Sequence, residues 1–205
     1  MRVRRFEPGP SPLRIDTIKG VSTLPAKHLI TCDEFERMGD VLVFTEGARL
    51  ELLEGEIIEM SPIGSPHAAC VYRLNALFAP LIGRAIIGVQ NPIRLGDISE
   101  PQPDVFLLRS KPDYYASGHA TPDEVLLVVE VSDTSLAFDR HRKRPMYAAA
   151  GIAELWIVDI AGEVIEIATD PRTDGYASIL RRGRGEHVVP SCFPDLSLGV
   201  DEILG

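Results

Sequence analysis

The amino-acid sequence predicts an α/β domain in which a mixed β-sheet is flanked by helices. Three apolar segments have the length and composition of buried strands, at residues 103–109, 125–131 and 154–159. Residues 65–82 carry apolar side chains at helical spacing, and a second helix is predicted at residues 139–150. Because helices and strands follow one another in this order, the helices are expected to cover a sheet.

A short helix and a hairpin are predicted before the first of these segments. Thr31 and Glu34 have the spacing of a capping box, which predicts a helix that continues to about Met38. Residues 50–60 predict two short strands joined by a tight turn at Glu54-Gly55.

The longer helix is expected to have Ser65 as its N-cap and Pro66 as its first helical residue. Its apolar residues form one stripe: Val71, Leu74, Leu77, Phe78 and Leu81. Gly151 is expected to end the second helix. The remaining strands are predicted at 85–89 and 92–95, with a later antiparallel pair at 164–167 and 176–180.

The length and composition of the chain are typical of one soluble domain. It has 205 residues, of which 45% are hydrophobic and 25% are charged. Residues 1–24 are rich in Pro, Gly and Arg, and are predicted to form a flexible N-terminal arm. No apolar run reaches the roughly 20 residues of a membrane span, and the N-terminus lacks the apolar region of a secretory signal.

The cysteine pattern indicates the compartment. Cys32, Cys70 and Cys192 are odd in number, lie far apart and form no C-x-x-C pair. They are therefore predicted to be reduced thiols and not a disulfide framework or a zinc site. We expect a cytoplasmic protein without membrane contact.

The net charge of −9 argues against a nucleic-acid interface that covers a whole face of the protein. Two dense basic clusters, residues 140–144 and 181–184, could still make local phosphate contacts. Within the first, Arg140, Arg142 and Arg144 are the candidate nucleic-acid contacts. The second is either a turn with solvated charge or a further phosphate-contact patch.

Two acidic residues accompany the predicted buried strands. Asp104 stands at the entrance of one strand, and Glu130 lies within the apolar run of another. An unpaired carboxylate in a dry interior costs several kcal/mol, so each needs an ion-pair partner, a shared cation or a proton. If the two strands are adjacent, the carboxylates can converge on Mg²⁺, with Mn²⁺ as an alternative, because these ions prefer oxygen ligands.

A lysine close to such a pair would orient water and stabilise developing charge. Strand alternation directs Ser132 to the same face as Glu130, so no lysine comes from the strand itself. Lys143, in the next helix, is the nearest candidate. It either reaches the acidic pair or forms an ordinary i,i+4 pair with Asp139.

Two further residues have both a functional and an ordinary interpretation. Glu51 could supply a third carboxylate, or it could belong to the polar face of a half-exposed strand. His67, in the first turn of the longer helix, could cap that helix, bind phosphate or have no special role. The histidine spacing does not match a zinc hydrolase, and no G-x-S-x-G, phosphate-binding loop or dinucleotide motif is present.

The order of these segments resembles one protein family. The residues that carry the resemblance are Leu50–Ile58, Ser61-Pro62, His67, Pro103–Val105, Val128–Ser135, Asp139, Lys143, Tyr147, Gly151 and Glu154–Asp159. Over about residues 25–204 the chain is similar to the putative restriction endonuclease family (the Uma-type group), a branch of the PD-(D/E)XK nuclease superfamily. The resemblance implies that residues 25–205 form a restriction-endonuclease-like mixed β-sheet core flanked by helices, with a metal site at one edge.

The resemblance also implies roles for individual residues. Asp104 matches the aspartate of the PD motif, Glu130 the second metal-binding acid, and Glu51 the early acidic position. Ser132 stands where the superfamily has the lysine of its E-x-K motif. Lys143 matches a lysine that this group presents from the following helix.

The function that the resemblance implies is hydrolysis of DNA phosphodiester bonds by a Mg²⁺-dependent endonuclease, which could act as a homodimer. Two alternatives remain. One is a nuclease-fold module that binds nucleic acid or a protein partner without cutting it, which the serine at position 132 and the acidic net charge favour. The other is a small-molecule hydrolase that uses the same carboxylates.

Overall fold

The computed structural model describes residues 27–205 except positions 42, 45 and 46. The predicted arm, residues 1–24, lies outside the described residues, so the division into an arm and a domain stays a prediction. The described helices include none long and apolar enough to cross a membrane. Cys32, Cys70 and Cys192 are free thiols.

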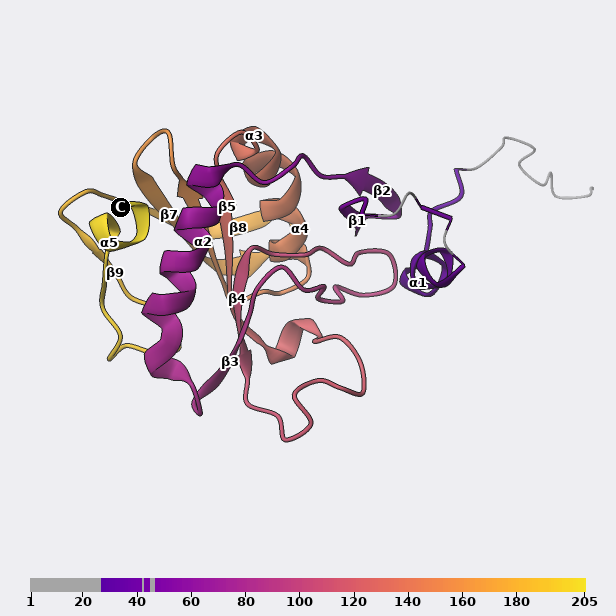
Figure 1. The fold of residues 1–205 in the computed structure, drawn as a ribbon, viewed down its shortest axis with the longest axis horizontal. Helices are drawn as coiled ribbons and strands as arrows, with labels where there is room; N and C mark the ends of the chain where they lie inside the picture. The colour runs from indigo at the N-terminus through magenta and orange to yellow at the C-terminus, as the bar shows by residue number, and fades with distance from the viewer. Residues whose placement is uncertain (1–26, 42, 45–46) are drawn as a thin grey trace, which may run out of the picture.

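A six-stranded mixed sheet forms the centre of the fold (Figure 1). Its strands, in spatial order, are β3 (Ala85–Gly88), β4 (Val105–Arg109), β5 (Val125–Ser132), β6 (Glu154–Asp159), β7 (Val164–Arg172) and β8 (Gly175–Gly183). All neighbours are antiparallel except β5 and β6, which run parallel. The helical segment between β5 and β6 makes the crossover that a parallel pair requires. The predicted mixed sheet flanked by helices is confirmed.

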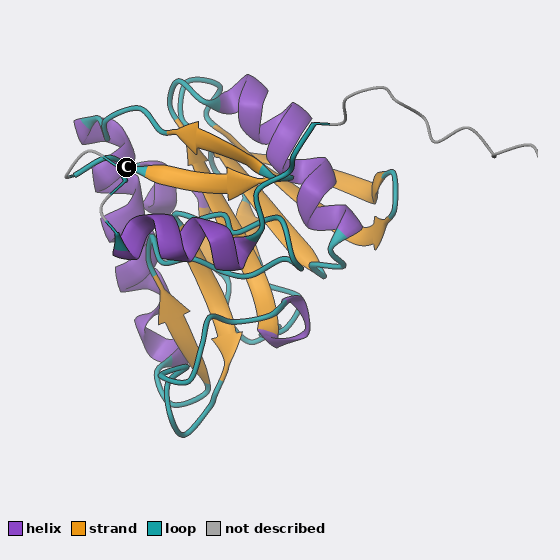
Figure 2. Ribbon diagram, turned by 90° about the vertical axis from the view of Figure 1, so that its right-hand side faces the viewer, coloured by secondary structure: helices purple, strands orange, loops and turns teal. Residues whose placement is uncertain are grey.

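Helices cover both faces of the sheet (Figure 2). On one face lie α2 (Ser65–Phe78) and α5 (Val200–Leu204), packed on a core that includes Phe78 and Trp156. On the other face, α4 (Arg144–Ala149) packs on β7 and β8, with Tyr147 in the core. Side chains of the central strands alternate between these two cores because successive strand residues point to opposite faces.

The N-terminal helix and hairpin form as predicted. Helix α1 (Cys32–Asp40) begins with a capping box between Thr31 and Glu34. Strands β1 (Leu50–Leu53) and β2 (Glu56–Glu59) form a two-stranded antiparallel hairpin. This hairpin is joined to the β3–β4 loop through a bridge between Leu52 and Glu100. A second small sheet, β9 (His187–Val188) with β10 (Leu198–Gly199), lies near the C-terminus.

Two local predictions were wrong. The N-cap of α2 is Gly64, and Ser65 is already helical; the helix ends at Phe78 and passes into a 3₁₀ turn, η1 (Ala79–Leu81). Residues 92–95 are not a strand, and only Ile93 makes an isolated bridge there. Pro92 has no N–H to donate, which interrupts a hydrogen-bond ladder at this point.

The second predicted helix is longer than expected and is not regular. It comprises α3 (Leu136–Phe138), a π-helical turn η3 (Asp139–Lys143) and α4, so it begins three residues before Asp139. The backbone N–H of Arg144 donates to the carbonyl of Asp139, five residues back. Pro145 lacks an N–H and its ring would crowd the carbonyl four residues earlier, so a wider turn fits this sequence better than an α-helix. Gly151, at φ +83°, ends the segment as predicted.

The C-terminal antiparallel pair is confirmed but is longer than predicted. Strand β8 continues to Gly183, so Arg181 and Arg182 lie in a strand and not in a turn. A further 3₁₀ turn, η2 (Pro122–Glu124), precedes β5.

A stability test follows from the close packing of Gly88 on Phe106, its cross-strand partner. A Cβ at position 88 would overlap the Phe106 ring. We expect Gly88→Ala to lower the free energy of unfolding by about 1–3 kcal/mol, since the buried ring must move. Gly39→Ala is the control, because a Cβ there would meet nothing within 4 Å and alanine favours helix. Urea denaturation of both variants measures the difference, and equal stability would contradict the packing argument.

Candidate active site

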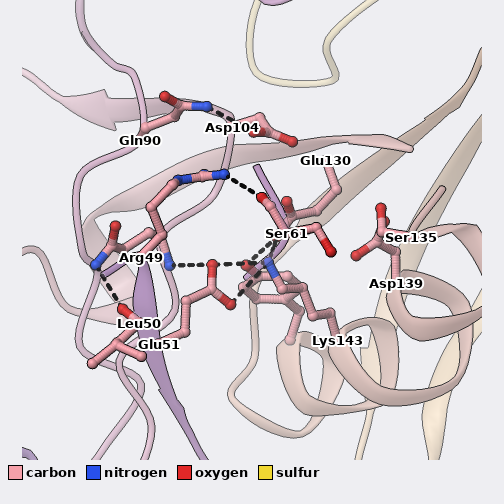
Figure 3. Close-up of polar contacts among 12 residues, drawn as sticks. Arg49, Leu50, Glu51, Ser61, Gln90, Asp104, Glu130, Ser135, Asp139 and Lys143 are labelled. Carbon is pink, nitrogen blue, oxygen red and sulfur yellow. Dashed lines mark hydrogen bonds and ion pairs between the residues drawn. The ribbon is translucent and has the colours of Figure 1, made fainter. Parts of the chain in front are cut away.

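Three carboxylates from separate elements meet at one end of the sheet (Figure 3). Glu130 belongs to β5, Asp104 immediately precedes β4, and Glu51 belongs to β1. On β5 the flanking Val129 and Val131 lie in the core under α2, while Glu130 points to the opposite face. Strand alternation therefore brings Glu130 into the site, as the sequence predicts.

Asp104 is a buried carboxylate with three hydrogen-bond partners. The pairing of Val105 with Val129 places Asp104 beside the end of β5. There it accepts hydrogen bonds from the backbone N–H of Val131 at 2.9 Å and from Gln90 Nε2 at 3.2 Å. His67 Nε2 lies 3.0 Å from Asp104 Oδ2. Burial disfavours the ionised form, but His67, Val131 and Gln90 outweigh it and lower the pKa of Asp104.

Glu130 is only 3% exposed and accepts two hydrogen bonds on the same oxygen. Lys143 Nζ donates to Glu130 Oε1 at 3.1 Å, and the Tyr147 hydroxyl donates to it at 2.7 Å. Burial raises the pKa of Glu130 to about 8, and Lys143 offsets this only in part because other carboxylates lie nearby.

Lys143 is the cation of the site and is itself 2% exposed. Its ammonium donates to Glu51 Oε1 and to Glu130 Oε1, at 3.1 Å each. Burial favours the neutral amine, but the nearby carboxylates outweigh it and raise the pKa of Lys143. The lysine is therefore an ammonium bound between two buried carboxylates, and the ordinary i,i+4 pair with Asp139 is not its main contact.

Asp139 has different partners, which sequence reasoning missed. Its Oδ2 accepts hydrogen bonds from Ser132 at 2.7 Å and from Ser135 at 2.6 Å. Ser132 thus connects the end of β5 to the π-helical turn that carries Lys143. The available signal was the position of Ser132, two residues after Glu130 on the same face of the strand.

Glu51 is a buried acid and not part of a solvent-exposed strand face. Its side chain is 3% exposed, and Oε1 accepts a hydrogen bond from the backbone N–H of Gln102 at 3.2 Å. Glu51 Oε2 lies 3.1 Å from Lys143 Nζ but accepts no hydrogen bond from the described residues. This oxygen is left with unused acceptor capacity inside the site.

These side chains line a cleft of about 390 Å³. Glu51, Asp104, Glu130 and Lys143 all contribute to it, together with the loop 60–64 that precedes α2. The fold brings together four residues that the sequence analysis identified as candidates, although they lie up to 92 positions apart along the chain.

The donor set fits a divalent cation. Asp104 and Glu130 offer the hard oxygen ligands that Mg²⁺ and Mn²⁺ prefer. One ammonium serves both Glu51 and Glu130, so negative charge exceeds positive charge in this buried region. Glu51 Oε2 accepts no hydrogen bond among the described residues, and the nearby carboxylates add to burial in raising the pKa of Glu130.

The three candidate nucleic-acid arginines are engaged in ion pairs. Arg140 and Arg144 bind Glu166, which is 1% exposed, at 2.9 and 3.1 Å. Arg142 pairs at 2.9 Å with Glu56 of the β1–β2 hairpin. His67, the fourth candidate, contacts Asp104. Their nucleic-acid contacts remain a prediction.

Residues that orient the acids were not singled out as site residues from the sequence. Tyr147 donates a hydrogen bond to Glu130, and Gln90 donates one to Asp104. Gln102 binds both the Glu51 carboxylate and the carbonyl of Leu50. Isolated glutamines carry no distinguishing pattern, whereas Tyr147 lies one helical turn after Lys143 and could have been found from that spacing.

A mixed sheet with these acids at one end and helices on both faces defines a protein of restriction-endonuclease-like fold. A profile of the Uma2 family, described as putative restriction endonuclease, matches residues 32–201. The chain belongs to this family.

A solved structure supports the same fold. The chain is similar to a crystal structure described as a putative nuclease belonging to DUF820 from Anabaena variabilis, with a TM-score of 0.64 and 16% sequence identity. The match covers 85% of this chain and 97% of that chain. Among functionally curated proteins, no sequence matches the chain.

Removal of the buried ammonium should destabilise the fold. We expect Lys143→Met to lower the free energy of unfolding by about 3–5 kcal/mol at about pH 9, because two buried carboxylates lose their cation. The deficit should shrink as the pH falls through about 8, because the pKa of Glu130 is raised to about 8 and its protonation removes one of the two buried negative charges. Guanidinium denaturation across this pH range measures it.

Lys111→Met is the matched control, because Lys111 is 37% exposed and pairs with Glu124. Its loss should cost no more than about 1 kcal/mol. Similar deficits in the two variants would mean that the Lys143 ion pairs contribute little.

Proposed function

We propose that this protein is a metal-dependent endonuclease that hydrolyses DNA phosphodiester bonds. The observation that carries the proposal is the Lys143 ammonium, held against Glu51 and Glu130 beside Asp104 in one cleft. An ammonium and a set of hard carboxylate ligands at one point can together activate water and stabilise the charge that develops in phosphodiester hydrolysis.

Asp104 and Glu130 would hold the metal, Mg²⁺ or alternatively Mn²⁺, with Glu51 as a helper ligand or as the group that positions the base. Such an ion lowers the pKa of a water ligand and offsets charge on the phosphoryl oxygens and the leaving group. The contacts of Asp104 with His67 and Val131 keep its carboxylate ionised and oriented for this role.

Lys143 would orient the attacking water and stabilise the charge that develops on the phosphate. Its raised pKa keeps it an ammonium, so it would act as a charge and hydrogen-bond donor and not as a base. The Tyr147 hydroxyl donates to Glu130, and the Ser132–Asp139 hydrogen bond fixes the start of the turn that carries Lys143. These residues would therefore position the reacting groups without touching the substrate.

DNA is the proposed substrate, and its phosphates would meet Arg140, Arg142, Arg144 and His67 near the cleft. Part of each of these arginines remains exposed, at 25%, 35% and 22%. We further propose a cytoplasmic protein that acts as a homodimer, with residues 25–205 as the nuclease-like domain.

A second candidate function is a nuclease-fold module that binds nucleic acid or a protein partner without cutting it. The observation that favours it is Ser132, which occupies the strand position of the superfamily lysine and is committed to Asp139. The cleavage test below separates the two.

Cleavage of plasmid and single-stranded DNA with Mg²⁺ or Mn²⁺ is the direct test. We expect metal-dependent nicking by the parent protein and a loss of at least about 100-fold in Glu130→Gln and Lys143→Ala, as is typical when a preorganised electrostatic group is removed. Circular dichroism confirms that each variant is folded under assay conditions.

Glu186→Gln and Lys111→Ala are matched controls on the surface, and both should cleave like the parent. A folded parent that binds Mg²⁺ but leaves DNA intact would contradict the nuclease proposal and favour the binding module.

DNA binding should survive the loss of a metal ligand. Asp104→Asn removes one negative charge from the cleft, so we expect equal or tighter DNA affinity together with lost cleavage. Fluorescence anisotropy at two salt concentrations measures the affinity, which should fall as salt rises. Loss of binding in parallel with cleavage would indicate that the protein holds DNA mainly through the metal.

A further inference from the structure

A second group of potential metal ligands lies away from the cleft. It consists of Glu36 on α1, Glu100 at the end of the β3–β4 loop and His119 in the loop between β4 and β5. One ligand atom from each residue lies within 4.8 Å of the others. Figure 1 shows α1 beside the tip of the β3–β4 loop, where the backbone N–H of Cys32 donates to the carbonyl of Asp97 at 2.7 Å.

Glu100 is the central member of this group, and one of its carboxylate oxygens has no hydrogen-bond partner among the described residues. Its side chain is 4% exposed, and within the part of the chain that the structure describes its Oε2 accepts no hydrogen bond. The position of the residue is fixed, because its backbone N–H donates to the carbonyl of Leu52 at 2.6 Å. A buried carboxylate without a partner is costly, so this oxygen points to a missing cation or proton.

The nearest arginine, Arg94, already pairs with another carboxylate. Arg94 donates to Asp33 at 2.6 Å and lies 3.9 Å from Glu36, and it makes no hydrogen bond to Glu100 among the described residues. Burial and then the charge of Glu36 raise the pKa of Glu100 to about 7. One arginine thus faces three carboxylates, and negative charge remains in excess.

We propose that Glu36, Glu100 and His119 bind a divalent transition-metal ion, of which Zn²⁺ fits the ligands best. An imidazole nitrogen with two carboxylate oxygens suits zinc, whereas Mg²⁺ prefers oxygen alone. Three protein ligands leave a coordination position for water. The ion would offset the negative charge of the carboxylates that Arg94 alone does not balance.

This site is separate from the cleft, and its ion would connect three segments of the fold. It would join α1 and the loop that carries His119 to the segment that bridges Leu52 of β1. Glu51 precedes Leu52, so the metal would stabilise the strand that delivers the third carboxylate to the cleft. The inference does not depend on the protein being a nuclease.

The test is Zn²⁺ binding to the full chain, measured by competition with a chromogenic chelator. All measurements use a protein with Asp104→Asn, which weakens metal binding in the cleft. His119→Ala and Glu100→Gln are each added to this background. We expect the Asp104→Asn protein to keep one tight Zn²⁺ equivalent. Adding either His119→Ala or Glu100→Gln should weaken it by more than about 100-fold, since a lost ligand costs more than a lost outer contact.

His187→Ala is the control, because His187 is an exposed histidine on β9, away from the group. It should bind Zn²⁺ like its parent. Replacement of Zn²⁺ by Co²⁺ gives a second readout: absorption bands of imidazole-bound cobalt should appear in the parent and be absent from His119→Ala. Zn²⁺ should also raise the melting temperature of the parent but not of His119→Ala.

Two results would overturn the proposal. One is the absence of tight Zn²⁺ binding in the Asp104→Asn protein. The other is equal binding when His119→Ala or Glu100→Gln is added. Either would mean that Glu36, Glu100 and His119 do not hold the ion. His119 is exposed, so its variant folds independently of the buried carboxylate and keeps the test decisive.

Discussion

The arrangement of the cleft depends on one buried ammonium. Lys143 joins Glu51 of β1 to Glu130 of β5, and it comes from a third element, the π-helical turn. None of the three charges is exposed enough to be solvated by water, so each is tolerable only because the others are present. The same interaction therefore attaches the β1–β2 hairpin to the sheet and assembles the acidic groups. The stability of the fold and the proposed chemistry therefore both depend on the ion pairs of Lys143.

The π-helical turn explains how a helix can supply a lysine that a strand lacks. Pro145 disfavours a regular α-helix at this point, and the wider turn directs Lys143 toward β5. Ser132 then has a supporting role, because it donates to Asp139 at the start of the same turn. The strand position without a lysine is thus hydrogen-bonded to Asp139, the first residue of the turn that carries Lys143. π-helical turns often occur at functional sites, and this one carries the ammonium that pairs with Glu51 and Glu130 in the cleft.

Three arginines converge on one buried carboxylate, that of Glu166. Burial disfavours the ionised form of Glu166, but Arg140 and Arg181 outweigh it and lower the pKa of that carboxyl, and Arg144 contacts it at 3.1 Å. This cluster connects β7 and β8 to the helical segment between β5 and β6. A chain of net charge −9 therefore keeps its fold by pairing buried acids with nearby bases. Among the described residues, negative charge stays in excess at the cleft and around Glu100.

Local sequence determined the features that depend on neighbours a few residues apart. Strand alternation placed Glu130 and Ser132 on one face, the capping box of Thr31 began α1, and the apolar stripe of α2 packed on the sheet. Only the tertiary structure decided that Lys143 binds Glu51 and Glu130 rather than Asp139, and that the arginines of the basic cluster pair with Glu166 and Glu56. A long charged side chain can reach several partners, and the choice depends on which of them the packing of distant elements has buried. The same reason applies to Glu100 and His119, which no spacing in the sequence connects.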